Sequence, residues 1–177
     1  MAIDAQLSGA LEALREQKIA VLGLKFNNTE ISPGDFVKKG DARTTPVISF
    51  DTANAAQKYI VLCLDPDAPH PSASFLLSPI LHWLQGNLQI PSDGSKVFLA
   101  MEAVMAGYRP PNPPGFSPPH RYVFLLYEQP DTLNLQQHIP KDGEQLGLWP
   151  RLKYDHDQLV QKMGLGEPVA ANYFISS

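Results

Sequence analysis

The sequence predicts one mainly β domain over residues 1–177, a sandwich or two-layer sheet of short strands with a few peripheral helices. Two apolar runs, 59–64 and 121–127, have the length and composition of buried core strands. Proline-rich segments separate the strands, and residues 110–119 contain six prolines, which excludes regular structure there. No alternation of strands with helices supports a parallel, doubly wound sheet.

A helix is expected near each end of the chain. The first lies within residues 1–18, where leucines recur at helical spacing, and its candidate N-caps are Asp4 and Ser8. The second lies within residues 154–164, where it opens on a capping box and closes at Gly164.

The other predicted elements are strands, because short apolar runs end at turn signals such as Asn27-Asn28. One of these runs contains the single cysteine, Cys63, which we expect to be a small buried hydrophobe without a disulfide partner. In chain order, the strands are predicted at residues 19–22, 24–26, 45–50, 59–64, 81–84, 97–104, 121–127 and 169–175.

Composition and charge argue against several classes of protein. A net charge of −4 with scattered Lys and Arg argues against a nucleic-acid partner and against electrostatic docking on anionic membranes. No apolar stretch approaches the length of a membrane span, so no integral membrane association is expected. No signal-peptide pattern is visible, and a reduced, cytoplasmic location is the default expectation. Neither a GxGxxG nor a P-loop pattern supports a nucleotide cofactor.

The segment Asp65-Pro66-Asp67-Ala68-Pro69 is the first candidate for a site. It follows the core run 59–64, so two carboxylates arrive at the exit of a buried strand. The two prolines restrict the backbone and make the segment stiff. Charged groups held in this way are typical of functional sites. A plain turn capped by Asp65 fits the residues equally well.

Two histidines accompany other predicted strands. His82 lies in the strand at 81–84, and period-two alternation predicts that it points to the face opposite Trp83. His120 ends the proline-rich segment and enters the strand at 121–127. Taken singly, His82 is more often a hydrogen-bonded core residue, and His120 could equally be a surface residue. The other histidines lie in polar segments and are expected to face solvent: His70, His138 and His156.

Three segments together resemble the phosphatidylethanolamine-binding protein family: DPDAP at 65–69, Leu81-His82-Trp83 followed by Asn87, and HRYVFLLY at 120–127. Their order and spacing match, and the resemblance runs from about Phe26 to Asn172-Tyr173-Phe174. It implies a β-sandwich-like domain with a small pocket at one end that binds an anionic group, such as phosphate or a phospholipid headgroup. It also makes Ala68–Pro69 a candidate cis bond. The ligand-binding residues expected on this basis are Asp65, Asp67, Pro69, His82, Trp83, Pro118, His120 and Tyr122.

Three departures from the family pattern predict a more apolar pocket. His70-Pro71 follows DPDAP where the family often has Ser-Arg, so an arginine that steadies the loop is missing. Leu77 falls near the place of a pocket tyrosine, and Pro118 replaces a glycine whose backbone N–H lies at the pocket rim. Fewer donors weaken the case for tight phosphate binding.

Two hypotheses of different classes remain open. The preferred one is a binding module without catalysis, which holds an anionic or phospholipid-like headgroup or a small metabolite, or regulates a partner protein such as a protease or kinase. The alternative is a cofactor-free acid–base enzyme of small-molecule biosynthesis, a dehydratase, isomerase or cyclase. In that enzyme His82, His120 and Asp65 would be catalytic.

Other chemistries have less support. No cofactor is expected, and no metal either. Two histidines with two carboxylates would suit zinc chemically, but the family does not use them in that way. Serine hydrolysis is weakly supported, because no GxSxG turn is present and neither Ser72 nor Ser117 is marked as a nucleophile.

Overall fold

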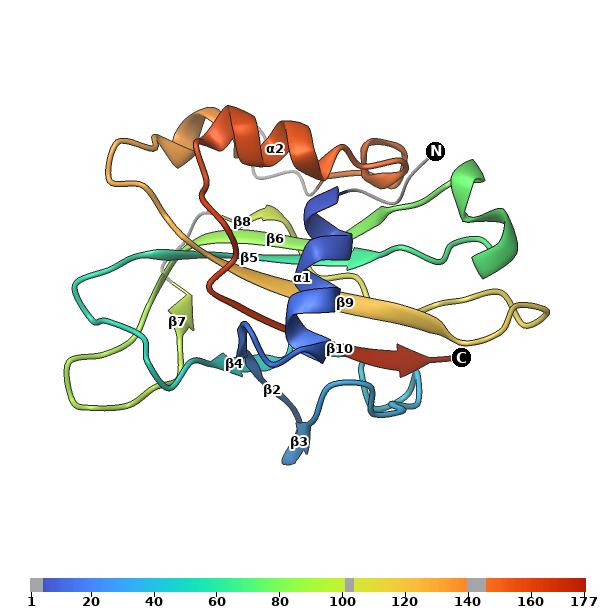
Figure 1. Ribbon diagram of the computed structural model, residues 1–177, viewed down its shortest axis with the longest axis horizontal. Helices are drawn as coiled ribbons and strands as arrows, with labels where there is room; N and C mark the ends of the chain where they lie inside the picture. The colour runs from blue at the N-terminus through green and yellow to red at the C-terminus, as the bar shows by residue number, and fades with distance from the viewer. Residues whose placement is uncertain (1–4, 101–103, 140–145) are drawn as a thin grey trace.

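Two packed sheets form the fold, as the strand pattern predicts (Figure 1). The computed structural model describes residues 5–100, 104–139 and 146–177. Within these ranges the larger sheet has seven strands, in the order β1-β10-β9-β5-β6-β7 with β8 also paired to β6. The smaller sheet has the order β3-β2-β4. The strands are β1 (Ala20–Val21), β2 (Gly23–Phe26), β3 (Thr29–Ile31), β4 (Val47–Ser49), β5 (Tyr59–Asp65), β6 (Ile80–Gln89), β7 (Leu99–Ala100), β8 (Val104–Ala106), β9 (His120–Glu128) and β10 (Ala170–Ser176).

Most predicted strands are present, and two differences have local causes. Strand β3 follows the turn at Asn27 so closely that sequence periodicity does not reveal it. The single strand predicted at 97–104 is instead two short strands, β7 and β8, which both pair with β6. Residues 101–103 of that prediction lie outside the described ranges.

The strands β5 and β9 lie at the centre because they are apolar on both faces. One face of the larger sheet packs against the smaller sheet through residues such as Phe26, Cys63 and Phe124. Cys63 is fully buried there, and burial raises the pKa of its thiol, as expected for a small core residue. The other face is covered by α1 (Ala5–Arg15) and α2 (His156–Met163).

The C-terminal helix begins and ends where the sequence predicts. The N-cap Asp155 accepts a hydrogen bond at Oδ1 from the backbone N–H of Gln158, at 2.8 Å. Gly164 ends the helix with a φ of 65°, a conformation that favours glycine. At the other end of the chain, Ser8 lies inside α1 and is not its cap, while Asp4 lies outside the described residues.

The prediction that His156 faces solvent is wrong. His156 is the first residue of α2 and is fully buried against the larger sheet. Its Nε2 lies 2.8 Å from the hydroxyl oxygen of Tyr127 in β9. The sequence neighbours of His156 are polar and lie on the outer side of α2. The local sequence therefore gives no sign that this one side chain points inward.

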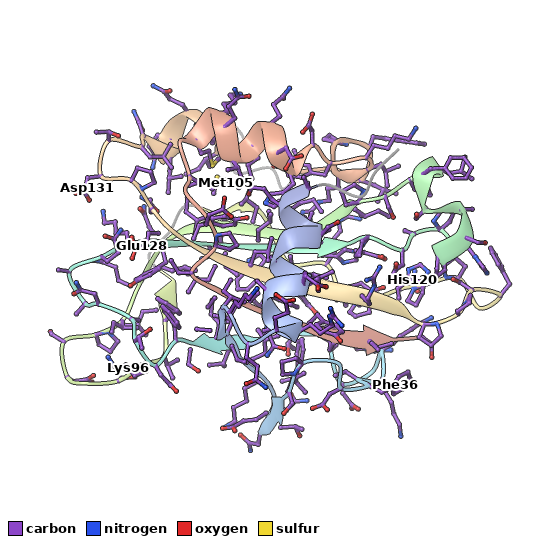
Figure 2. The ribbon with its side chains drawn as sticks, in the orientation of Figure 1. Phe36, Lys96, Met105, His120, Glu128 and Asp131 are labelled. Atoms are coloured by element: carbon purple, nitrogen blue, oxygen red, sulfur yellow. The ribbon has the colours of Figure 1, made fainter. Side chains whose placement is uncertain are left out.

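No helix in the described part of the chain is both long enough and apolar enough to span a bilayer. The 3-10 helices among the described residues are η1 (Pro71–Leu76), η2 (Leu135–Gln137) and η4 (Trp149–Arg151). Figure 2 places His120 and Glu128 at opposite ends of β9, and the loops that follow β5 and precede β9 gather at the His120 end. Functional groups from both loops can therefore meet there.

Asn172 links the two sheets from a fully buried position on β10. Its Nδ2 donates to the carbonyl oxygens of Leu22, at 2.7 Å, and of Ile31 in β3, at 3.0 Å.

Replacing Asn172 with alanine is expected to lower the free energy of unfolding by about 2–4 kcal/mol, because two buried acceptors lose their donor. Urea denaturation measures the change. Asn28→Ala, at an exposed turn, should change stability by less than about 0.5 kcal/mol, and equal effects would contradict the linking role.

Candidate functional site

A β-bulge in β6 turns His82 toward the same face of the sheet as Trp83. Trp83 lies opposite Cys63 of β5 while Leu81 lies opposite Leu64, so His82 is an extra residue in the pairing. The ring of His82 packs edge-on against Tyr122, with centroids 5.0 Å apart. The Trp83 ring packs at 6.5 Å from Phe124, which shares its face of β9 with Tyr122. The predicted opposite placement of His82 and Trp83 is therefore wrong, because alternation requires an uninterrupted strand.

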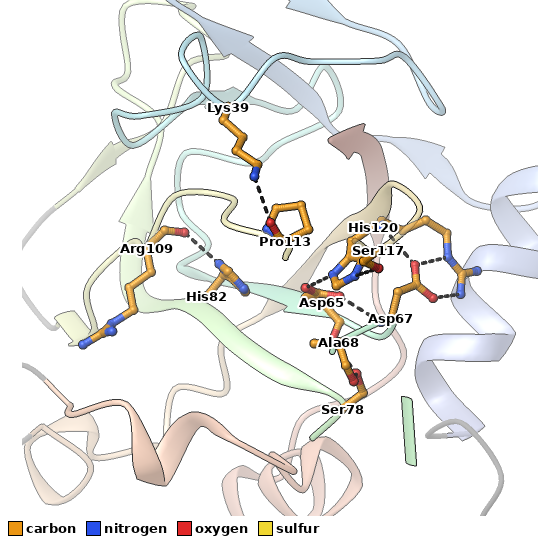
Figure 3. A network of polar contacts seen from close by, with 11 residues as sticks. Lys39, Asp65, Asp67, Ala68, Ser78, His82, Arg109, Pro113, Ser117 and His120 are labelled. Carbon is orange, nitrogen blue, oxygen red and sulfur yellow. Dashed lines mark hydrogen bonds and ion pairs between the residues drawn. The ribbon is translucent and has the colours of Figure 1, made fainter. Parts of the chain in front are cut away.

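Backbone contacts fix the tautomer of His82. Its Nδ1 lies 2.8 Å from the carbonyl oxygen of Arg109 (Figure 3). A carbonyl only accepts, so Nδ1 carries the proton and the neutral ring keeps a lone pair on Nε2. Burial lowers the pKa of His82, with smaller opposing effects from its surroundings. His82 is therefore a neutral hydrogen-bond acceptor at neutral pH.

His120, the first residue of β9, is engaged on both ring nitrogens. Its Nδ1 lies 2.9 Å from Oδ2 of Asp65, and both side chains are buried. Its Nε2 lies 2.8 Å from Oγ of Ser117 (Figure 3). The carboxylate accepts a hydrogen bond from Nδ1–H, so Nε2 of the neutral ring accepts one from the Ser117 hydroxyl. The second oxygen of Asp65 accepts the backbone N–H of Asp67 at 2.8 Å.

The order Ser117, His120, Asp65 is that of a nucleophile, a base and a carboxylate that orients the base. Attack by a serine also needs donors for the oxyanion that forms. The N–H of Ser117 is already bonded to the carbonyl oxygen of Pro114 at 2.9 Å, and residues 118 and 119 are prolines without an N–H. Ser117 and the two residues that follow it therefore offer no backbone donor for an oxyanion, and hydrolysis gains no support from them. Ser72 hydrogen-bonds instead with His70 in an exposed segment.

Asp67 is turned away from His120 and is held by Arg121. The guanidinium donates to Oδ1 of Asp67 at 2.7 Å and to Oδ2 at 2.9 Å, and the backbone N–H of Arg121 also donates to Oδ2. This pairing raises the pKa of Arg121. Asp67 therefore anchors the loop after β5 to the start of β9.

A cavity of about 820 Å³ lies at this end of the sheets. Its polar lining residues are Asp65, His82, Asn112, His120 and Tyr122, and its cationic ones are Lys39, Arg43 and Arg109. The rest of the described lining is apolar: Ala68, Pro69, Leu77, Ile80, Pro110, Pro111, Pro113, Pro114, Leu148, Trp149 and Leu152. The chain thus lines the cavity with a polar and cationic set of residues and a larger apolar wall.

The structure brings together five of the eight predicted binding residues at this cavity: Asp65, Pro69, His82, His120 and Tyr122. The other three lie outside the described lining. Asp67 binds Arg121, Trp83 packs in the aromatic core, and Pro118 follows the loop that forms the wall. The Ala68–Pro69 bond is cis, as expected, and Leu77 lines the cavity.

The cationic residues were not predicted from the sequence. Lys39, Arg43 and Arg109 come from two loops distant in the chain, and only the adjacent pair Lys38-Lys39 is unusual in the sequence. Nζ of Lys39 donates to the carbonyl oxygen of Pro113 at 2.8 Å, which ties these loops together. Trp149 was also missed, although its side chain is 82% exposed at the cavity mouth.

No group of three or more His, Cys, Asp or Glu side chains converges as a metal-ligand set in the described part of the chain. The side chains considered above do not form such a set because they already have other partners. Asp67 is bound to Arg121, and both ring nitrogens of His120 have partners.

The lowered pKa of His82 predicts a pH effect on stability. As the pH falls below 6.5, the unfolded chain takes up a proton at His82 before the folded chain does, so the folded state loses stability. His82→Gln should remove this part of the slope, down to the lowered pKa of the folded state. Urea denaturation between pH 7 and pH 5 tests it. The residual slope includes His138, whose pKa is also lowered by burial, and an unchanged slope would refute the assignment to His82.

A family model described as phosphatidylethanolamine-binding protein matches residues 24–174. A curated relative, "Phomoidride biosynthesis cluster protein N" of Talaromyces stipitatus, is 32% identical over 88% of this chain and 83% of its own. Among solved structures, "Phosphatidylethanolamine-binding protein from Plasmodium vivax" aligns with a TM-score of 0.69 at 16% identity, over 94% of this chain and 96% of that one. A carboxypeptidase Y inhibitor, solved with its cognate proteinase, aligns with a TM-score of 0.70 at 20% identity, over 99% and 98% of the two chains.

Proposed function

This chain belongs to the phosphatidylethanolamine-binding protein family, and we propose that its cavity binds a small organic ligand that joins an anionic group to an apolar part. The anionic group is of the phosphate or phospholipid-headgroup kind. One observation carries the proposal: the cavity combines three cationic side chains with a single buried carboxylate and a wall of proline, leucine and tryptophan. A ligand with both kinds of group satisfies the two parts of this lining.

The chemistry of the lining suggests how the ligand is oriented. Its negative charge faces Lys39, Arg43 and Arg109, because the carboxylate of Asp65 would repel it. A hydroxyl or ammonium hydrogen of the ligand faces Nε2 of His82, which accepts. The apolar part lies along the prolines and Trp149 at the mouth.

Arginine substitution tests the binding proposal. Arg43→Gln should weaken binding of O-phosphorylethanolamine about tenfold, equivalent to about 1.4 kcal/mol, because one charge-assisted contact is lost. Trp149 fluorescence or calorimetry measures the affinity. Arg15→Gln, on α1 outside the described lining, is the matched control. Absence of binding by the native chain, or equal affinities for the two variants, would count against a phosphate-type ligand.

Acid–base catalysis is a second candidate, favoured by the tautomer of His82. A neutral imidazole with its lone pair in a cavity can remove a proton from a bound molecule. The cationic side chains would stabilise the negative charge that develops, and the protonated Nε2 of His82 would return its proton to the bound molecule. Such proton transfer requires no cofactor. The relative from a biosynthesis cluster supports this candidate.

Hydrogen exchange tests the catalytic candidate. A useful probe is 2-oxooctanoate, which joins a carboxylate to an apolar chain and has acidic C3–H bonds. In deuterated water the native protein should accelerate deuterium uptake at C3, with a rate that rises with pH through the lowered pKa of His82 and then levels off. His82→Gln should reduce the rate at least about a hundredfold. Equal rates of deuterium uptake with and without the protein would contradict the catalytic candidate, and the non-catalytic binding function would remain.

The proposal also includes a cytoplasmic location and a protein partner that responds to the bound ligand. The one cysteine is buried as a free thiol, which is consistent with a reducing compartment. Fractionation of the tagged full-length chain tests the location, and co-purification with and without O-phosphorylethanolamine tests the partner.

A further inference from the structure

Arg151 is a fully buried arginine directly behind the strand that carries His82. It lies in η4, next to Trp149 and Leu152 of the cavity lining. Its Nη1 donates to the carbonyl oxygens of Leu81 and His82, each at 3.2 Å. Its Nε donates to the carbonyl oxygen of Leu146 at 3.0 Å. The guanidinium therefore contacts the two consecutive residues that form the bulge in β6.

The bulge needs donors from outside β5. An extra residue disrupts the regular ladder, so its backbone groups must find other partners. The backbone N–H of Arg109 also donates to the His82 carbonyl oxygen, at 2.8 Å. The main chain at His82 is thus held from two sides, by Arg109 and by Arg151. A planar guanidinium suits this role, because its donors have fixed directions.

The position of Arg151 is costly for a purely structural residue. Among the described residues it forms no ion pair, and its Nη2 is buried without a hydrogen-bond partner. Burial lowers the pKa of Arg151 to about 10, so the side chain remains a cation at neutral pH. Apolar residues often replace buried ions without loss of stability. A role at the neighbouring site therefore explains the buried charge better than a contribution to stability does.

We propose that Arg151 is a positioning residue that fixes the bulge in β6 and thereby aims Nε2 of His82 into the cavity. This inference rests on the proposed function of the same site, since it explains how the acceptor in that site is placed. Arg151 acts through His82 and contacts no ligand. The positive charge of Arg151 has a second effect, which is to disfavour a second proton on the His82 ring.

Four groups set the charge state of His82. Burial has the largest effect and lowers its pKa. The hydrogen bond to the Arg109 carbonyl oxygen and the charge of Asp65 raise it, while the charges of Arg151 and Arg109 lower it. The ring of Tyr122 packs against the imidazole and limits its access to water. Removal of the Arg151 charge should therefore raise the pKa of His82 toward its ordinary value of 6.5.

Two substitutions separate geometry from charge. Arg151→Lys keeps the charge but loses the planar set of donors, so the ring should lose its single tautomer while its pKa changes little. Arg151→Gln loses the charge as well, so the pKa of His82 should also rise. Lys153→Gln removes an exposed charge two residues away and should change neither property.

Ring nitrogen-15 chemical shifts of His82, assigned with His82→Gln, measure the tautomer and the pKa. Hydrogen exchange of the Arg109 backbone amide reports how stable its hydrogen bond to the His82 carbonyl oxygen is. We expect the exchange rate of this amide to rise at least about tenfold in both Arg151 variants. Thermal unfolding identifies variants that do not fold, and Arg151→Lys is the milder change if Arg151→Gln fails.

Because these measurements use no ligand, they test the inference separately from the binding proposal. If folded Arg151→Lys matches Lys153→Gln in tautomer and in amide exchange, the positioning role is overturned. If O-phosphorylethanolamine fails to bind while the shifts change as expected, the inference stands and the proposed ligand class falls.

Discussion

The hydrogen bond between Asp65 and His120 is the constraint on which this end of the molecule depends. It joins the last residue of β5 to the first residue of β9, and both side chains are buried. A buried carboxylate is tolerated only when its oxygens have donors, and Asp65 receives them from His120 and from the backbone of Asp67. The turn after β5 and, through Ser117, the proline-rich loop before β9 are therefore fixed relative to each other. The hydrogen bond between Asp65 and His120 therefore sets the shape of the cavity wall.

The two histidines of the cavity have different chemical capacities, although the sequence presents them as equivalent. His120 has partners on both ring nitrogens and acts first as part of the frame. His82 is held through Nδ1, and Nε2 of its neutral ring keeps a lone pair. The cations that complete the site, Lys39, Arg43 and Arg109, come from other loops. In the proposed function, recognition of charge and acceptance of a hydrogen bond therefore belong to separate parts of the chain.

The sequence predicts the features that depend on local pattern. The apolar runs of β5 and β9, the capped helix α2 and the acidic turn at Asp65 all follow from neighbouring residues. It does not predict the bulge at His82, because a register shift is a property of two strands that are distant in the chain. Nor does it predict the burial of His156, which depends on how α2 packs on Tyr127. The family resemblance locates the pocket, whereas its cationic side and the role of Arg151 require three-dimensional proximity.

The bulge in β6 makes the site depend on the length of a strand and not only on the identity of its side chains. Without the extra residue, the alternation of β6 would assign His82 and Trp83 to opposite sides of the sheet. A reading frame that lacks one codon between Ile80 and Trp83 could therefore encode an intact sandwich with no acceptor in its cavity. In the proposed function, ligand recognition therefore depends on the register of β6 as well as on the identity of its side chains.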